Sequence, residues 1–197
     1  MNSFQLVITS EWWDYIPGFL PPETFSQLLS EVSQTCKVHT VTIYGKEYPS
    51  KRMSCYFTSL GETPNSKSRN YNYDDLSSFD WSASPTLSAI KEKVEKFLET
   101  DYDYCLVHIY RDGTDTIGWH NDKEALNTDI ASLSLGATRK FRFRKIGETS
   151  GWEKEFPLQN GDLLHMKTGC QRNYKHTVPV EKTVKEPRIN LTFRKFE

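Results

Sequence analysis

The stretch RINLTFR, residues 188–194, alternates polar and apolar side chains in the manner of a β-strand. Side chains at i and i+2 share one face of a strand, so this strand has one apolar face and one polar face. The polar face consists of Arg188, Asn190, Thr192 and Arg194. If that face is buried, its two guanidinium groups need anionic partners, and arginine binds carboxylates bidentately. The stretch therefore predicts either a buried site for a small dicarboxylate or an edge strand whose charged face lies in water.

Short strand-like stretches of the same kind precede this one from residue 104 onward. They are YCLVHIY (104–110), IASLSLGATRKFRFRK (130–145), FPLQNGDLLHMKTG (156–169) and HTVPV (176–180). In the third stretch, Asn160-Gly161-Asp162 is a turn signal between two strands. Many short strands separated by turns are typical of a jelly roll, in which two sheets pack face to face. We therefore expect a jelly-roll core over residues 104–197.

Two amphipathic helices are predicted in the first half of the chain. Residues 21–36 begin with two prolines and then place apolar residues at helical spacing. Residues 84–100 begin with Ser84 as a natural N-cap and Pro85 in the first turn. The polar, Tyr-rich stretch 61–82 between them is predicted to be a long loop. The expected fold class is thus α+β, with N-terminal helices in front of a jelly roll.

The composition indicates one globular domain. The chain has 197 residues, 37% of them hydrophobic, which suits a single domain with its own core. A net charge of −1 gives no overall basic character that would by itself indicate a nucleic-acid partner. No apolar run is long enough to span a membrane, and the start MNSFQLVITSEWW lacks a signal-peptide pattern. We expect a monomer without a membrane partner.

The cysteines are scattered along the chain, at positions 36, 55, 105 and 170, with no C-x-x-C pair. This spacing predicts reduced thiols rather than a disulfide framework or a zinc site. The expected location is therefore the nucleus or the cytoplasm, where thiols stay reduced.

The stretch GWHND, residues 118–122, places His120 and Asp122 on one face if the backbone is extended. Two imidazoles and one carboxylate form the facial triad that holds non-haem Fe(II) and leaves coordination positions open. The third ligand would come from one of the other histidines: His39, His108, His165 or His176. His176 begins the predicted strand HTVPV, which makes it one suitable candidate. The alternative is that His120 and Asp122 merely bridge each other in a binding domain without catalysis.

Taken together, these segments resemble the AlkB-type 2-oxoglutarate/Fe(II) dioxygenases. The resemblance lies in H-x-D at 120–122, a distal histidine, the RINLTFR ending, and IYRDGTDTIGWHNDKEALNTDIASLSLGATRKF, residues 109–141. It covers the chain from about Phe19 to Phe196 and is strongest after Cys105. It implies a double-stranded β-helix as the catalytic core within a single domain, residues 1–197.

The resemblance also implies the cofactors and their ligands. Fe(II) would be held by His120, Asp122 and His176, and the cosubstrates would be 2-oxoglutarate and O2. Binding of 2-oxoglutarate would fall to residues of two strands: His108, Tyr110, Arg188, Asn190, Thr192 and Arg194. This chain departs from the family at His108, where the family usually has Asn. A neutral imidazole can still donate one hydrogen bond, as an amide does; the alternative is a core histidine.

The activity implied is oxidative demethylation of N-alkylated bases, 1-methyladenine and 3-methylcytosine, in DNA, with release of formaldehyde. A nucleotide-recognition lid would span about residues 40–82. The residues expected to contact the substrate are Tyr44, Gly45, Lys46, Arg52, Tyr71, Tyr73 and Glu124. Residues 43–46 are similar to the finger hairpin of the family branch that repairs duplex DNA. In this hairpin Tyr44 would fill the gap left by a flipped base, Gly45 would allow the turn, and Lys46 would touch phosphate. Tyr71 and Tyr73 would stack on the base, and Glu124 would contact it.

Two other functions fit the same residues. The first keeps Fe(II) and 2-oxoglutarate but acts on RNA, a protein or a small molecule. The second is the non-catalytic jelly-roll binding domain, which leaves the paired arginines of residues 188–194 without a purpose. The identity of the preferred base and the choice between single and double strands are left open by the sequence.

Overall fold

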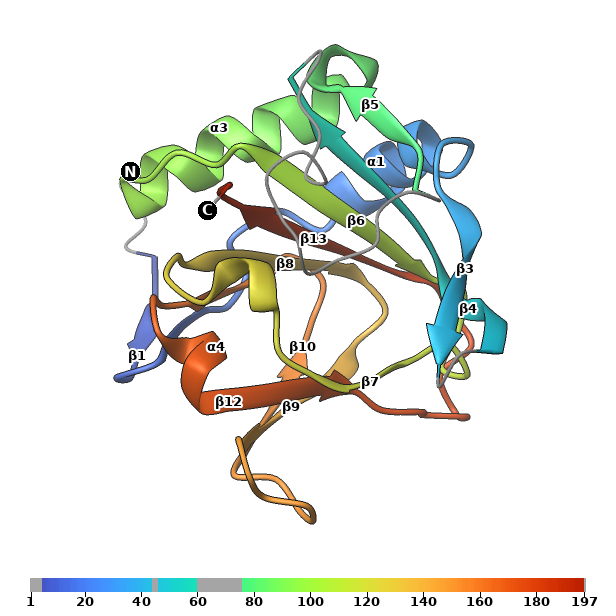
Figure 1. Cartoon of the computed structure of the whole chain (residues 1–197). Coiled ribbons are helices and arrows are strands. Elements are labelled where there is room, and N and C mark those ends of the chain that lie inside the picture. The colour runs from blue at the N-terminus through green and yellow to red at the C-terminus, as the bar shows by residue number, and fades with distance from the viewer. Residues whose placement is uncertain (1–4, 44–45, 60–75, 197) are drawn as a thin grey trace.

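The computed structural model describes residues 5–43, 46–59 and 76–196, which form a pair of β-sheets that face each other (Figure 1). The larger sheet runs β1 (Ile8–Thr9), β2 (Trp13–Ile16), β11 (Asp162–Met166), β8 (Ile130–Gly136), β13 (Arg188–Arg194), β6 (Tyr104–Tyr110), β4 (Lys46–Thr58), β3 (Lys37–Ile43), with β5 (Ser78–Asp80) beside β4. The smaller sheet runs β10 (Lys154–Leu158), β9 (Arg139–Lys145), β12 (Tyr174–Val178), β7 (Ile117–His120). The described chain is therefore mostly β-sheet with few helices, which agrees with a jelly-roll fold.

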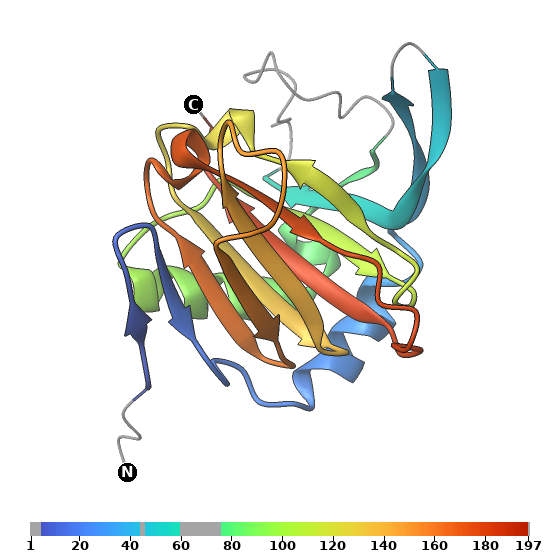
Figure 2. The ribbon, with the colours of Figure 1, turned by 90° about the horizontal axis from the view of Figure 1, so that it is seen from below.

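Two helices cover the outer face of the larger sheet. Helix α1 (Thr24–Val32) lies within the range 21–36 predicted from the sequence, and α3 (Pro85–Leu98) lies within 84–100. Their buried apolar residues join one core with the apolar face of the central strands, such as Leu28 of α1, Val94 of α3 and Leu191 of β13. Seen from below, the smaller sheet lies in front of the larger sheet and the helices lie behind it (Figure 2).

The two helices are linked by one half-buried carboxylate. Ser84 caps α3 by accepting a hydrogen bond from the backbone N–H of Leu87, as the sequence predicts. Glu31 of α1 accepts hydrogen bonds from the Ser84 hydroxyl and, at 3.1 Å, from the backbone N–H of Thr86. The N-terminus of α3 is thus held against α1. The remaining short helical segments are η1 (Trp81–Ala83), η2 (Lys123–Ala125) and α4 (Cys170–Asn173).

The stretch 156–169 forms the two predicted strands, but they do not pair with each other. β10 pairs with β9 in the smaller sheet, whereas β11 pairs with β8 and β2 in the larger one. The turn at Asn160–Asp162 therefore crosses between the layers. Gly161 has a positive φ of 91°, and a Cβ there would lie 2.2 Å from the carbonyl oxygen of Leu20. Glycine is required because the turn packs directly against another backbone segment.

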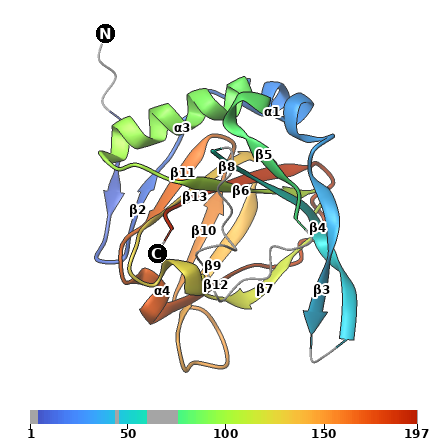
Figure 3. The same cartoon turned by 45° about the horizontal axis from the view of Figure 1, so that its top comes forward.

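The hairpin predicted around residues 43–46 is present as the antiparallel pair β3–β4, in which Ile43 lies opposite Lys46. Figure 3 shows this hairpin extending away from the two sheets. The connecting residues Tyr44 and Gly45 lie outside the described residues. The second half of β4, from Met53 to Thr58, continues into the larger sheet and pairs with β6. One strand thus connects the projecting hairpin to the centre of the fold.

The prediction of four reduced thiols is wrong for one pair of cysteines. Cys36 and Cys55 form a disulfide, with Cα atoms 4.7 Å apart. Their proximity follows from strand pairing, since Lys37 lies opposite Ser54 at the start of β3. A contact of this kind between residues 19 positions apart has no local sequence signal. Cys105 and Cys170 are free and buried. None of the helices in the described ranges combines the length and apolar character needed to cross a bilayer.

Candidate metal centre and cosubstrate pocket

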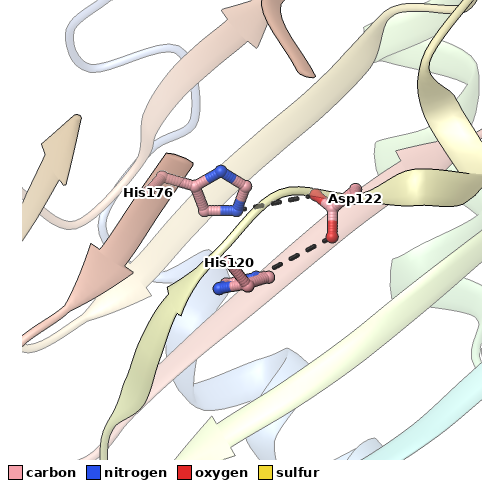
Figure 4. A group of neighbouring side chains, drawn as sticks. All are labelled: His120, Asp122 and His176. Carbon is pink, nitrogen blue, oxygen red and sulfur yellow. Dashed lines mark ion pairs between the residues drawn. The ribbon is translucent and has the colours of Figure 1, made fainter. Parts of the chain in front are cut away.

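His120, Asp122 and His176 come together between the two sheets (Figure 4). His120 ends β7, and His176 is its direct partner on β12. Asp122 follows two residues after His120, where the chain has left the strand. Each side chain offers one ligand atom, and the three atoms all lie within 4.8 Å of one another. Strand pairing across 56 residues of sequence therefore selects His176 from the candidate histidines. In the described part of the chain, His39, His108 and His165 lie outside this group.

Both imidazoles present Nε2 to the carboxylate. Nε2 of His120 lies 3.8 Å from Oδ1 of Asp122, and Nε2 of His176 lies 3.5 Å from Oδ2. Nδ1 of His120 lies 2.8 Å from the carbonyl oxygen of Gly118, which fixes the proton on Nδ1 when the ring is neutral. Burial lowers the pKa of His120, and burial together with the neighbouring His120 lowers the pKa of His176 to about 3. Neutral rings with free lone pairs on Nε2 are the form that binds metals.

Asp122 is held in place from two sides. Its backbone N–H donates to Oε1 of Gln171 at 3.0 Å, and Arg194 Nη2 lies 3.1 Å from Oδ1. Burial alone would raise the pKa of Asp122, but the charge of Arg194 and the nearby imidazoles outweigh it and lower the pKa to about 2. The carboxylate is therefore ionised throughout the neutral range.

This donor set fits a ferrous ion. Oδ2 of Asp122 is buried and has no hydrogen-bond partner within the described residues. Two imidazole nitrogens and one carboxylate on one side of a site match the triad that binds non-haem Fe(II) and leaves positions for other ligands. Without a cation, three lone-pair donors would face one another with nothing between them.

The cavity in front of these ligands is lined by the polar face of the larger sheet and by the smaller sheet. Its lining consists of His108, Tyr110, Ile117, His120, Asp122, Ser132, Phe141, Met166, His176, Val178, Asn190, Thr192 and Arg194. β13 lies between β6 and β8, and each of its polar residues has a register partner with a polar side-chain group on at least one of these strands. Asn190, for example, lies opposite His108 on one side and Ser134 on the other. The alternation seen in RINLTFR thus becomes one wall of a pocket, and the edge-strand alternative is wrong.

Arg188 is the strongest candidate for binding a carboxylate. The side chain is 1% exposed and packs over the ring of Tyr110, 5.2 Å from its centroid. Nη2 donates to Ser134 Oγ at 2.8 Å, while Nε and Nη1 are buried without a hydrogen-bond partner in the described part of the chain. Burial lowers its pKa to about 10, so the group remains cationic at neutral pH. These unpaired donors on a buried cationic group are suited to form charge-assisted hydrogen bonds with a carboxylate.

Arg194 has protein partners instead. Its guanidinium forms ion pairs with Asp122 and with Glu124, and all three side chains are buried. The two arginines predicted to share a dicarboxylate therefore differ: Arg188 has unpaired donors, and Arg194 connects the metal-ligand side of the pocket to Glu124. Glu124 lies in η2, and its carboxylate is next to Arg194.

The other residues predicted for the site are distributed as follows. Thr192 lines the cavity and donates to the backbone oxygen of Leu106. Arg52 is buried against His108, whereas Lys46 is exposed at the start of β4. The remaining predicted contacts, Tyr44, Gly45, Tyr71 and Tyr73, lie outside the described residues.

Several residues that shape the pocket were missed from the sequence. Ser132 and Ser134 of β8 accept hydrogen bonds from Asn190 and Arg188. Their i, i+2 spacing within an otherwise apolar strand repeats the pattern of β13 and was an available signal. The contact of Gln171 with Asp122, by contrast, depends on tertiary structure alone.

Comparison with known proteins agrees with this geometry. The model of the 2OG-Fe(II) oxygenase superfamily matches residues 13–194. An uncharacterized protein R406 of Acanthamoeba polyphaga mimivirus is 30% identical over 189 residues, covering 94% of either chain. The DNA oxidative demethylase ALKBH2 of Bos taurus is 32% identical over 183 residues, which cover 88% of this chain but 63% of the bovine protein.

The fold also matches a solved structure, that of OsALKBH1. The two have a TM-score of 0.62 at 18% identity, and the match covers 96% of this chain and 100% of the other. At that identity the match concerns the fold alone. The family implies Fe(II), 2-oxoglutarate and O2 as cofactors. The chain belongs to the 2OG-Fe(II) oxygenase superfamily and is an AlkB-type member of it.

Proposed function

We propose that this chain is an oxidative demethylase of N-alkylated bases in DNA. The observation that carries the proposal is the proximity of two groups. The ligands His120, Asp122 and His176 line one cavity, and the buried, unpaired donors of Arg188 lie beside it, because Arg188 packs over Tyr110 of the cavity lining. Relatives support the substrate class, because bovine ALKBH2 bears the name DNA oxidative demethylase. The bases proposed are 1-methyladenine and 3-methylcytosine.

The metal would be held by the two Nε2 atoms and one oxygen of Asp122. Bound Fe(II) together with 2-oxoglutarate supplies the activation of O2 that oxidises a C–H bond. The overall change converts O2, 2-oxoglutarate and the N-methyl group into CO2, succinate and an N-hydroxymethyl group. That group then loses formaldehyde and restores the N–H or free ring nitrogen of the base.

The residues of the pocket orient the cosubstrate. Arg188 binds the carboxylate far from the metal through its unpaired guanidinium donors, and Tyr110 packs against the guanidinium plane. Asn190 and Thr192 line the wall between Arg188 and the metal ligands. Because these side chains already lie in the pocket or pack directly beside it, little reorganisation is needed when the keto-diacid enters.

The substrate side of the site is formed by the carboxylate of Glu124 and by the β3–β4 hairpin. Glu124 pairs with Arg194 next to Asp122, and its carboxylate is expected to contact a base that carries positive charge. Lys46 is exposed on the β3–β4 hairpin and contacts phosphate, with Tyr44 as the wedge in duplex DNA and Gly45 as the turn residue. Tyr71 and Tyr73 stack on the flipped base, within the lid at residues 40–82.

The test is formaldehyde release from methylated oligonucleotides in the presence of Fe(II), 2-oxoglutarate and O2. Single-stranded DNA, duplex DNA and RNA of one sequence are compared, each with 1-methyladenine or 3-methylcytosine. Release from DNA that is abolished by Asp122→Ala supports the proposal. Release from RNA alone, or turnover of 2-oxoglutarate with no nucleic acid demethylated, overturns it in favour of another substrate. Lack of any visible charge-transfer band with anaerobic Fe(II) and 2-oxoglutarate favours the binding domain.

The hairpin is tested separately with a matched pair of tyrosines. Tyr44→Ala should reduce demethylation of duplex DNA more than that of single-stranded DNA, since only the duplex leaves a gap to fill. Tyr48→Ala is the control, because Tyr48 is exposed on the same hairpin and lies opposite Val41. Equal losses on the two substrates, or equal losses for the two variants, would remove the wedge assignment.

A further inference from the structure

His108 occupies the middle of the pocket wall. On β6 it lies between Ser54 of β4 and Asn190 of β13, each its direct register partner. The imidazole is 5% exposed and lines the cavity that contains the metal ligands. In this position one ring nitrogen can form hydrogen bonds with the protein, and the other can form a hydrogen bond with a ligand in the pocket.

Within the described residues, the hydrogen bonds between this ring and the protein use Nδ1 alone. Ser54 Oγ lies 2.8 Å from Nδ1, and Arg52 Nε donates to the same atom at 3.3 Å. A guanidinium can only donate hydrogen bonds, so Nδ1 must be the acceptor and cannot carry a proton. The Ser54 hydroxyl can rotate and then donates as well. A neutral ring with these partners carries its proton on Nε2.

The other nitrogen is available to a ligand. Within the described residues, no protein group forms a hydrogen bond with Nε2, although the ring faces the cavity. Burial lowers the pKa of His108 well below its usual value, and the positive charges of Arg52 and Arg194 lower it further. The ring is therefore neutral and offers one N–H donor.

From these contacts we propose that Arg52 and Ser54 are positioning residues that hold His108 as its neutral Nε2–H tautomer, so that Nε2 donates a hydrogen bond to an oxygen of 2-oxoglutarate. The ligand named here rests on the proposed function. The arrangement gives Arg52 a role inside the fold rather than in direct contact with the substrate. Arg52 lies on the strand that also carries the projecting hairpin, so a shift of β4 at the hairpin would alter the donor presented to the cosubstrate.

The tautomer is tested directly by nitrogen NMR on the full chain. The ¹⁵N shifts of a histidine show which ring nitrogen is protonated, and the His108 signals are identified by their loss in His108→Asn. We expect a protonated Nε2 and an unprotonated Nδ1 before any ligand is added. In Ser54→Ala and Arg52→Met, the preference for Nε2–H should weaken. A proton on Nδ1 in the unsubstituted chain overturns the proposal.

The link to the cosubstrate is tested by a double-mutant cycle on 2-oxoglutarate affinity, with Mn(II) in place of iron. Arg52→Met and Ser54→Ala should each weaken binding by about threefold to tenfold, the range for one neutral hydrogen bond. In a His108→Asn background neither change should have a further effect, because no tautomer remains to be set. Arg52→Lys, which keeps a donor, should restore part of the affinity.

Lys51→Gln is the matched control, since Lys51 is exposed and adjacent to Arg52. It should leave the affinity unchanged. An equal loss for Arg52→Met with and without His108 overturns the proposal, because Arg52 would then act on the ligand directly. Ser54→Ala provides the same comparison if Arg52→Met fails to fold. A chain that binds no 2-oxoglutarate refutes the proposed function and the ligand named here, whereas the ligand-free spectra still decide the tautomer.

Discussion

His120 and His176 lie directly opposite each other on β7 and β12, with ring centroids 4.3 Å apart. Their Nε2 atoms approach different oxygens of Asp122. Protonation of both rings would place two like charges beside one carboxylate in a buried site, which is unfavourable. The pair is therefore neutral, and its lone pairs converge with the carboxylate on one point. A divalent cation at that point satisfies all three groups.

Replacing one of these imidazoles should abolish tight metal binding. His176→Ala should lower Fe(II) affinity by more than the roughly 10–100-fold that is typical when only a hydrogen-bond partner of a ligand is lost. Anaerobic titration calorimetry with Fe(II) measures this directly. His165→Ala is the control, because His165 lies against Asp129 at 2.9 Å, outside the metal-binding group. Similar losses for the two variants would argue against the assigned ligands.

Strand positions were predictable because alternation is a local property. YCLVHIY and RINLTFR correspond to β6 and β13 with the same bounds, Tyr104–Tyr110 and Arg188–Arg194. β4 was missed because KEYPSKRMSCYFT does not alternate and contains Pro49, which is unfavourable inside a sheet. The segment of β4 that carries Pro49 belongs to the projecting hairpin, where Pro49 lies opposite Thr40. Hairpin and sheet strand are thus one element, which the local pattern does not reveal.

The neighbours of the polar face of β13 could not be predicted, for a related reason. The polar face of β13 is visible in the sequence, but its neighbours depend on which strands pair. That β6 and β8 flank β13 brings His108 and Ser134 to opposite sides of Asn190. Family resemblance, rather than spacing, singled out His176 as the third ligand. The contact between Arg52 and His108 spans 56 residues and had no sequence signal.

Replacing Arg188 should weaken binding of the cosubstrate without lowering the stability of the protein. Arg188→Met removes a buried guanidinium with two unpaired nitrogens and leaves a side chain of similar length. Such replacements of buried charge by apolar groups are often neutral or stabilising. We expect unchanged or higher stability in urea without ligand, together with a 2-oxoglutarate KM raised at least about tenfold, since a charge-assisted hydrogen bond is lost. A destabilised protein whose KM is unchanged would contradict this assignment.

Gly113 should tolerate no side chain. A Cβ at this position would lie 1.8 Å from the carbonyl oxygen of Glu181, and the backbones of the two residues are hydrogen-bonded at 2.8 Å. Gly113→Ala must therefore push the two loops apart, at a cost of about 1–3 kcal/mol. Thermal unfolding should show the loss. Gly118→Ala is the control, because a Cβ there meets nothing within 4 Å; equal destabilisation by both variants would contradict the packing argument.

Separation of these loops should also weaken cosubstrate binding, because a buried arginine connects them to the pocket. Arg139 is 1% exposed and donates to the backbone oxygens of Asp112, Asp115 and Pro179, which belong to the same two loops. Its guanidinium also packs 5.6 Å from the ring centroid of Tyr110, on which Arg188 packs as well. We therefore expect the 2-oxoglutarate KM of Gly113→Ala to rise even at temperatures where the protein is fully folded. A normal KM would show that the loops and Tyr110 are independent.

Asp129 should make stability depend on pH. Its Oδ2 accepts a hydrogen bond from the Tyr102 hydroxyl at 2.6 Å and lies 2.9 Å from His165 Nε2. Burial alone would raise the pKa of Asp129, but these hydrogen bonds outweigh it and lower the pKa from 3.8 to about 2. Because the folded state favours the ionised carboxylate, the stabilisation is fully present above about pH 4 and is lost as the pH falls toward 2.

The size of this contribution can be measured by urea unfolding from pH 7 down to pH 2. One pKa unit corresponds to about 1.4 kcal/mol, and partial exposure reduces the total to about 1–2 kcal/mol at neutral pH. Asp129→Asn should be less stable than the unsubstituted chain by about this amount at pH 7, and the two curves should converge toward pH 2. Asp101→Asn, at an exposed carboxylate, should follow the unsubstituted curve throughout. A gap for Asp129→Asn that stays constant with pH would mean that packing, and not ionisation, links Asp129 to its partners.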